Sequence, residues 1–279
     1  MKAFLKRFCA NRGAAAGLAV LLAVIVAGAL APLLYEESPW MMVGPPLLAP
    51  FSDPAFPLGT DMLGRDIAAG LIYGARVSLL IGVISTAVAV FIGILVGALS
   101  GYFGGRLDDF LMRMTEFFQT IPQLAMAMVL VAIFKPNLVS IVGAIAMVSW
   151  PPVARLVRSE FMTLRTREFV QAAVVIGQRP GRIILTQILP NAASPIIVTA
   201  SLMTATSILT ESALSFLGLG DRNLMSWGFM IGAARTMLRE APMMSMWPGL
   251  AIMLTVLAIN LIGEGLNDAL NPQLRKRGA

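Results

Sequence analysis

The sequence has 279 residues, of which 57% are hydrophobic and 13% are charged, whereas a soluble domain carries about 25% charged residues. It holds no histidine and one cysteine, Cys9, which excludes Ser-His triads, His-ligated metal sites and an intrachain disulfide. The net charge of +6 does not indicate nucleic-acid binding, because the cations follow a membrane topology.

Apolar runs recur along the whole chain, each near the roughly 20 residues that a helix needs to cross a bilayer. A β-barrel would show short alternating segments instead. The first run is too long for a signal-peptide core and predicts a retained helix. The pattern therefore predicts an all-α polytopic membrane protein with about six transmembrane helices, at 14–34, 77–100, 115–134, 138–154, 192–217 and 247–266.

The distribution of Lys and Arg predicts the orientation of these helices. Fifteen of the 21 Lys and Arg residues fall before the first run, in 101–114, in 155–182 and at the end of the chain. Cytoplasmic segments carry such an excess. Six spans with both termini in the cytoplasm satisfy this bias, whereas five spans would place one basic end outside.

The expected organisation has two parts. Residues 1–76 form a cytoplasmic tail, the first helix and an outer loop, and residues 77–279 form a core of five transmembrane helices. The outer loop is predicted to be compact and to contain its own ion pairing among glycines and prolines. Its charged and glycine positions are Gly59, Asp61, Gly64, Arg65 and Asp66.

The loop 155–191 is the most informative segment, because it is long, polar and strongly basic between two apolar runs. A helix over 159–178 would bring Ala172, Ala173 and Gly177 together, and such small residues let another protein approach the backbone closely. Pro190 suits the first turn of the next span. The competing interpretation is an amphipathic helix that lies on anionic lipid.

Ionisable residues within a bilayer are costly and often functional. Glu211 and Glu264 are the candidates, with Asn260 one turn before Glu264. The simpler interpretation, which we favour, places Glu211 near the outer end of its helix and Glu264 near the inner end of its own. The glycines of 101–105 predict a tight turn rather than a phosphate-binding loop, because no Walker motif accompanies them.

Several motifs together resemble the permease subunits of ATP-binding-cassette (ABC) importers of the dipeptide, oligopeptide and nickel class, specifically the second, "C"-type permease. The loop 155–191 resembles the cytoplasmic "EAA" loop that docks onto the ATPase subunit in that family. The remaining motifs cover most of the chain and lie at 57–66, 73–79, 101–108, 211–220, 227–228, 247–249 and 260–268.

The resemblance implies a type I ABC importer permease fold and half of a translocation pathway in the bacterial inner membrane. It implies a homologous second permease, two ABC ATPase subunits and an extracytoplasmic solute-binding protein as partners. It also implies that this chain is not an enzyme and binds no metal or cofactor itself, since ATP and Mg lie on the ATPase subunits. For the outer loop 55–76, contact with the binding protein or a plug over the pathway stands beside plain scaffolding.

One position departs from the family pattern. The family carries Glu before the two alanines, whereas Gln171 stands there in this chain. Glutamine keeps the size and one oxygen but loses the charge, so a charge-assisted contact to the ATPase becomes a neutral one. Glu168, three residues earlier, offers a partial substitute.

Two other function classes compete with this interpretation. An intramembrane enzyme would need a nucleophile with a base or a metal site, and an ion-coupled secondary transporter would need ion ligands at broken helices. The absence of histidine and of paired aspartates in the spans disfavours the enzyme, and the secondary transporter does not explain a basic loop with this spacing. The solute is left open by the sequence between peptides, nickel complexes, opines, glutathione and some sugars.

Overall fold

A computed structural model of the chain describes residues 8–270, which are mostly helical apart from the loops, of which 35–66 is the longest. Five of its helices are long and apolar enough to cross a bilayer, and the bent pair α4–α5 makes six if it counts as one span. The basic residues at both ends, Lys2 to Arg7 and Arg275 to Arg277, lie outside the described residues. The elements of the first half are α2 (Arg12–Leu34), α3 (Ile67–Phe103), α4 (Gly105–Thr120), α5 (Gln123–Phe134) and α6 (Leu138–Arg165).

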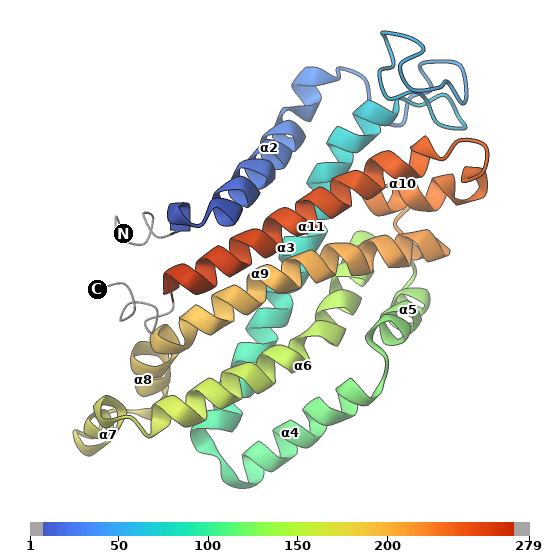
Figure 1. Cartoon of the computed structure of the whole chain (residues 1–279). Helices are drawn as coiled ribbons and strands as arrows, with labels where there is room; N and C mark the ends of the chain where they lie inside the picture. The colour runs from blue at the N-terminus through green and yellow to red at the C-terminus, as the bar shows by residue number, and fades with distance from the viewer. Residues whose placement is uncertain (1–7, 271–279) are drawn as a thin grey trace.

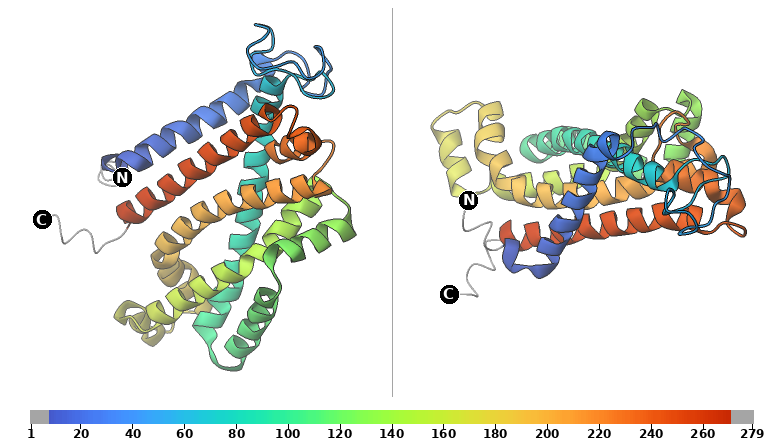
Figure 2. Two further views of the ribbon diagram at one scale, coloured as in Figure 1. Left: turned by 45° about the vertical axis from the view of Figure 1, so that its right-hand side comes forward. Right: turned by 90° about the horizontal axis from the view of Figure 1, so that it is seen from above.

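The second half continues from the tip of the long loop to the end of the bundle. Its elements are α7 (Glu168–Val175), α8 (Pro180–Ile183), the π-helix η1 (Ile184–Ile188), α9 (Leu189–Leu214), the π-helix η2 (Ser215–Leu219), α10 (Trp227–Ala234), the 3₁₀ turn η3 (Arg235–Met237) and α11 (Met243–Leu270). Segment 35–66 and α7 lie at opposite ends of the bundle, and α2 lies along α11 (Figures 1 and 2).

The helix α3 is the central element, and it packs most extensively against α6. Gly93, Gly97 and Gly101 recur every four residues and share one face of α3. A Cβ at Gly93 would lie 2.5 Å from Val153 Cβ, and one at Gly97 would lie 2.7 Å from Val157 Cβ. The two backbones therefore approach closely through a stripe of small residues, as is common between helices in lipid.

The span expected at 115–134, which Pro122 is expected to interrupt, consists of two helices. The chain breaks at Pro122, and α4 and α5 meet at an angle of 87°. Proline lacks an amide hydrogen and disfavours helical dihedrals at the residue before it, and Ile121 is extended. The 12 residues of α5 rise only about 18 Å, which is too short to cross a bilayer alone.

Other expected boundaries also differ from the structure. The second span begins at Ile67, where Asp66 caps the helix, rather than at 77. The fourth continues through Pro151 and Pro152 to Arg165 rather than ending at 154. The fifth follows a helical path that begins at Pro180 rather than at 192. At 1.5 Å per residue, the lengths of α3 (37 residues) and α6 (28 residues) exceed the thickness of the hydrocarbon core, about 30 Å, so both helices project beyond it.

The glycine stripe generates a stability prediction. Gly97→Val should destabilise the chain by about 1–3 kcal/mol, because the added methyl groups collide with α6 and the helices must separate. Gly143→Val is the matched control, since Gly143 lies within α6 and its added Cβ meets no atom within 4 Å. Thermal unfolding of the purified protein checks the difference, and equal midpoints for both variants would contradict the close packing.

Candidate functional site

The tip of the long loop is a separate short helix, α7, rather than the continuous helix expected over 159–178. The helix α6 ends at Arg165, and Arg167 adopts extended dihedrals before α7 begins. Gln171 spans this break, because its side-chain Nε2 donates to the Arg165 carbonyl at 2.9 Å. The single helix expected over 159–178 is therefore wrong. The Gln171 side chain supplies a hydrogen bond to a carbonyl at the end of α6, where no further helical turn provides one.

One face of α7 holds it against the rest of the protein. Val170 and Ala173 are buried in a core cluster with Phe161 of α6, Ile183 of α8 and Ile188 of η1. Ala173 is therefore turned into the fold and does not offer its side chain to a partner. We call this buried contact of Val170 and Ala173 the apolar seat of α7. It joins α7 to α6 and to the continuous helical path Pro180–Leu219, the α9 path.

The opposite face of α7 is exposed. Glu168, Gln171, Ala172 and Val175 lie along it, and each is three or four residues from another member of the set. Val175 is 86% exposed, and the next residue, Ile176, is 77% exposed. Sequence reasoning did not select these two residues, although the unbroken apolar run 174–176 was a signal, because a helix this short cannot bury three consecutive apolar side chains.

Gly177 ends α7 in a left-handed conformation, with φ of +81°. Its N–H donates to the Val174 carbonyl at 2.9 Å, and the Gln178 N–H donates to the Ala173 carbonyl at 3.1 Å. This pair of bonds is the Schellman motif, in which glycine is preferred because it has no Cβ. A Cβ at Gly177 would meet no atom within 4 Å, so within this chain the requirement is one of backbone conformation.

Pro190 is the second residue of α9, as expected for a proline, but the helical path has already begun at Pro180. The π-helical turn η1 precedes it, where the Leu189 N–H bonds to the Ile184 carbonyl. That wider turn lets the chain accommodate a residue that has no amide hydrogen. Pro190 therefore lies inside a bent span rather than at its start.

The inner loop around Asp108 ties α4 to α3 and α6. Arg158 holds Asp108 with two hydrogen bonds of 2.6 Å, from Nε and from Nη2, and Ser100 Oγ also donates to Asp108. Such a bidentate pair fixes orientation as well as distance. The segment 101–108 therefore positions α4 beside the base of the loop 155–191.

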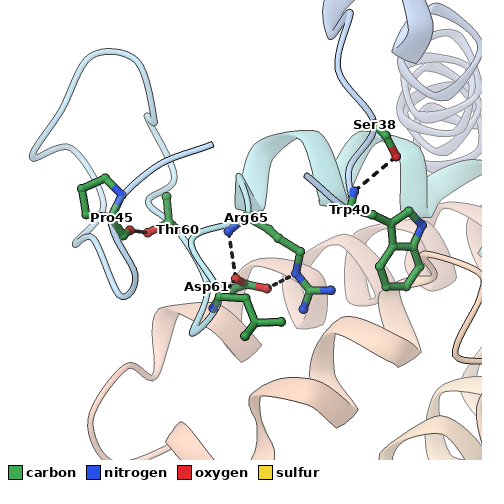
Figure 3. Close-up of polar contacts among 7 residues, drawn as sticks. Ser38, Trp40, Pro45, Thr60, Asp61 and Arg65 are labelled. Atoms are coloured by element: carbon green, nitrogen blue, oxygen red, sulfur yellow. Dashed lines mark hydrogen bonds and ion pairs between the residues drawn. The ribbon is translucent and has the colours of Figure 1, made fainter. Parts of the chain in front are cut away.

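The outer-loop residues are brought together and bind one another (Figure 3). Asp61 accepts hydrogen bonds from the N–H groups of Leu63 and Arg65 and forms an ion pair of 2.6 Å with the Arg65 side chain. The Arg65 guanidinium also lies over the rings of Trp40 and Phe229, at 5.4 and 5.9 Å, a cation–π geometry. These contacts support the scaffolding interpretation.

The remaining members of the outer-loop set also have internal roles. Gly59 and Gly64 have positive φ and lie close to the carbonyls of Leu48 and Gly44. Asp66 caps α3 by accepting from the Ala68 N–H at 2.8 Å. Burial raises the pKa of Asp66 above its ordinary value, and hydrogen bonds from two backbone amides lower it in part. The exposed apolar side chains of this loop are different residues, such as Met42 and Phe51.

The three intramembrane polar residues are not brought together. Glu211 lies near the outer-loop end of α9, whereas Asn260 and Glu264 lie toward the other end of the bundle on α11. Glu264 is exposed, but Glu211 is 1% exposed and accepts hydrogen bonds of 2.8 Å from Ser215 and Ser226. Glu211 therefore binds the start of α10 instead of reaching water.

Comparison with known proteins gives consistent matches over the whole chain. A family described as "Binding-protein-dependent transport system inner membrane component" matches residues 89–276, and one described as "N-terminal TM domain of oligopeptide transport permease C" matches residues 1–57. The chain is 39% identical to the di/tripeptide transport system permease protein DppC of Pseudomonas aeruginosa, over 99% of this chain and 93% of that protein.

Further relatives have similar names. The dipeptide transport system permease protein DppC of Alkalihalophilus pseudofirmus is 40% identical, over 97% of this chain and 89% of that protein. The oligopeptide transport system permease protein OppC of Haemophilus influenzae is 37% identical, over 97% and 88%. The inward-facing MetNI methionine ABC transporter aligns with a TM-score of 0.60 at 18% identity, over 72% of this chain and 96% of that chain. That likeness confirms the fold expected from the sequence.

Gly177 generates the first prediction for this site. Gly177→Val should loosen the end of α7, because a β-branched residue is strained at positive φ, while Gly177→Asn should keep the loop, since asparagine tolerates that conformation. Hydrogen exchange of the α7 amides checks this order. If the asparagine variant keeps the slow amide exchange of α7 but less ATPase subunit is recovered with the protein, the glycine also serves close contact with a partner. Equal exchange for the unaltered protein and both variants would contradict the conformational role.

Gln171 generates a second prediction, because its two candidate roles order the variants differently. Gln171→Glu removes the donor to the Arg165 carbonyl, so α7 amides should exchange about fivefold faster, as expected for a neutral hydrogen bond of about 1 kcal/mol. Gln171→Lys keeps a donor and should exchange more slowly than the glutamate variant. If contact with an ATPase dominates instead, substrate-stimulated ATP hydrolysis should survive in the glutamate variant and fall in the lysine variant.

Proposed function

The chain belongs to the inner-membrane permeases of binding-protein-dependent ABC importers, of the oligopeptide permease C type, and from this premise we propose its substrate, its partners and its mode of coupling. It is a transmembrane permease subunit, multi-pass in the inner membrane. The proposed solute is a di- or oligopeptide, supported by the names of relatives that align with nearly the entire chain.

The proposed assembly contains a homologous second permease, two ATPase subunits and an extracytoplasmic solute-binding protein. ATP and Mg bind and react on the ATPase subunits, and this chain supplies no cofactor site. The termini and α7 face the cytoplasm, and segment 35–66 faces outside, in keeping with the Lys and Arg distribution. An ion-coupled secondary transporter is disfavoured by the family membership.

The exposed apolar tip of α7 is the observation that carries the docking proposal. Val175 and Ile176 project from a helix whose other face is fixed in the core by Val170 and Ala173. Apolar side chains presented this way on a charged loop are typical of a protein interface. The alternative, an amphipathic helix on lipid, is less suited to a helix of eight residues with its charged residue Glu168 on the same exposed face.

Coupling follows from how α7 is connected. Its seat contacts α6, α8 and η1, and α6 packs along α3 through the glycine stripe. A displacement of α7 by closing ATPase subunits would therefore move α6 and the α9 path as a packed unit, rather than bending a loose loop. Rigid-body motion of this kind is a common means of transmitting a change between sites.

The tip generates the test of the proposed function. The double variant Val175→Asp and Ile176→Asp should reduce ATPase subunits recovered with a tagged form of this chain at least tenfold, because each buried apolar side chain contributes about 1.5–3 kcal/mol. Thr163→Asp is the control, an exposed position on the neighbouring α6. Unchanged recovery for the double variant, with the chain still inserted, would show that α7 is not the docking surface.

A further inference from the structure

A large apolar groove runs between α2 and the face formed by α3, α9 and α11. Its volume is about 780 Å³, and Val24, Leu79, Val83 and Ile259 are among the residues that line it. It is open on one side, where Val83 is 55% exposed. In a bilayer, this opening faces the hydrocarbon region rather than water.

Arg76 is the charged residue among those that line the groove, and it lies at one end of it. Its stem packs on α2, because a Cβ at Gly28 would lie 3.2 Å from Arg76 Cγ. Within residues 8–270, the side chain of Arg76 has no ion pair and no hydrogen bond at standard distances. An exposed cation without a carboxylate partner therefore lies at one end of the apolar groove.

Arg76 also borders a second groove, of about 380 Å³, toward segment 35–66. Ser38, Tyr73 and Asn223 line that groove beside it. Arg76 therefore lies between two mainly apolar grooves and contributes a charge to both. A ligand that fits this arrangement is amphiphilic, with an anionic head on Arg76 and an aliphatic chain in the larger groove.

The depth of Arg76 matches the level of lipid headgroups. The helix α3 has 37 residues and rises about 55 Å, roughly 25 Å more than the hydrocarbon core. Arg76 lies about 14 Å along α3 from Ile67, near the boundary where the core begins. From Arg76 to Ile84, the lining of α3 covers about 12 Å, which accommodates much of an acyl chain.

We propose that this groove binds an anionic phospholipid of the leaflet beside segment 35–66, with its phosphate on Arg76 and one acyl chain between α2 and α3. Arginine pairs with phosphate through two parallel hydrogen bonds, and a basic pocket between transmembrane helices is a known form of lipid site. A helix of a second permease is the competing occupant of the apolar groove, and the crosslinking experiment below distinguishes it from lipid. The proposal does not depend on the transported solute.

Native mass spectrometry of the assembled complex in detergent, with added phosphatidylglycerol or phosphatidylethanolamine, tests the proposal. The unaltered complex should retain phosphatidylglycerol in preference to phosphatidylethanolamine. Arg76→Gln should reduce retained phosphatidylglycerol about tenfold, whereas Arg239→Gln, an exposed arginine that lines neither groove, should not. Val83→Trp should fill the groove and displace both lipids, with Val88→Trp as the matched control on α3.

Equal retention of phosphatidylglycerol by the unaltered complex and by Arg76→Gln would overturn the proposal. So would a crosslinker placed at Val83→Cys that captures another protein chain instead of lipid, because the groove would then be filled by a subunit. If the tryptophan variant fails to assemble, the Arg76→Gln measurement decides alone, since no partner in the described fold depends on that side chain.

Discussion

The close approach of α3 to α6 is the constraint on which the rest of the structure depends. In lipid, no hydrophobic effect drives two apolar helices together, so contact relies on shape, and the stripe of Gly93, Gly97 and Gly101 supplies it. Because α3 exceeds the bilayer thickness, this one contact orients both ends of the protein. It places Asp66 and the outer loop at one end and the Asp108–Arg158 pair at the other.

The two ends differ in how they are stabilised. The outer loop holds itself together by internal polar bonds, centred on the Asp61–Arg65 pair, and by the aromatic contacts of Arg65. The α7 end instead uses a buried apolar contact under α7 and a left-handed glycine after it. Because Val170 and Ala173 pack into the core, α7 is held to its neighbouring helices while its opposite face stays exposed.

The buried Glu211 shows how polar groups within the span are used. It accepts from Ser215 and Ser226 at the point where the π-helix η2 ends α9 and α10 turns back. A Cβ at Gly228 would lie 2.8 Å from both of its carboxylate oxygens, so α10 must start close to it. Glu211 Oε1 accepts both bonds and so ties α10 to the end of α9, whereas the buried Oε2 has no hydrogen-bond partner among the described residues.

The sequence by itself predicted the fold class, the family and the approximate spans, because apolar length and turn-forming residues are local signals. The comparisons confirm the family and the fold. Only the tertiary structure decided the rest. Three details depend on which neighbours fill each helix face, and that information lies in residues far away in the chain. They are whether Ala172 or Ala173 faces outward, which carbonyl Gln171 binds, and that α6 continues through Pro151 and Pro152.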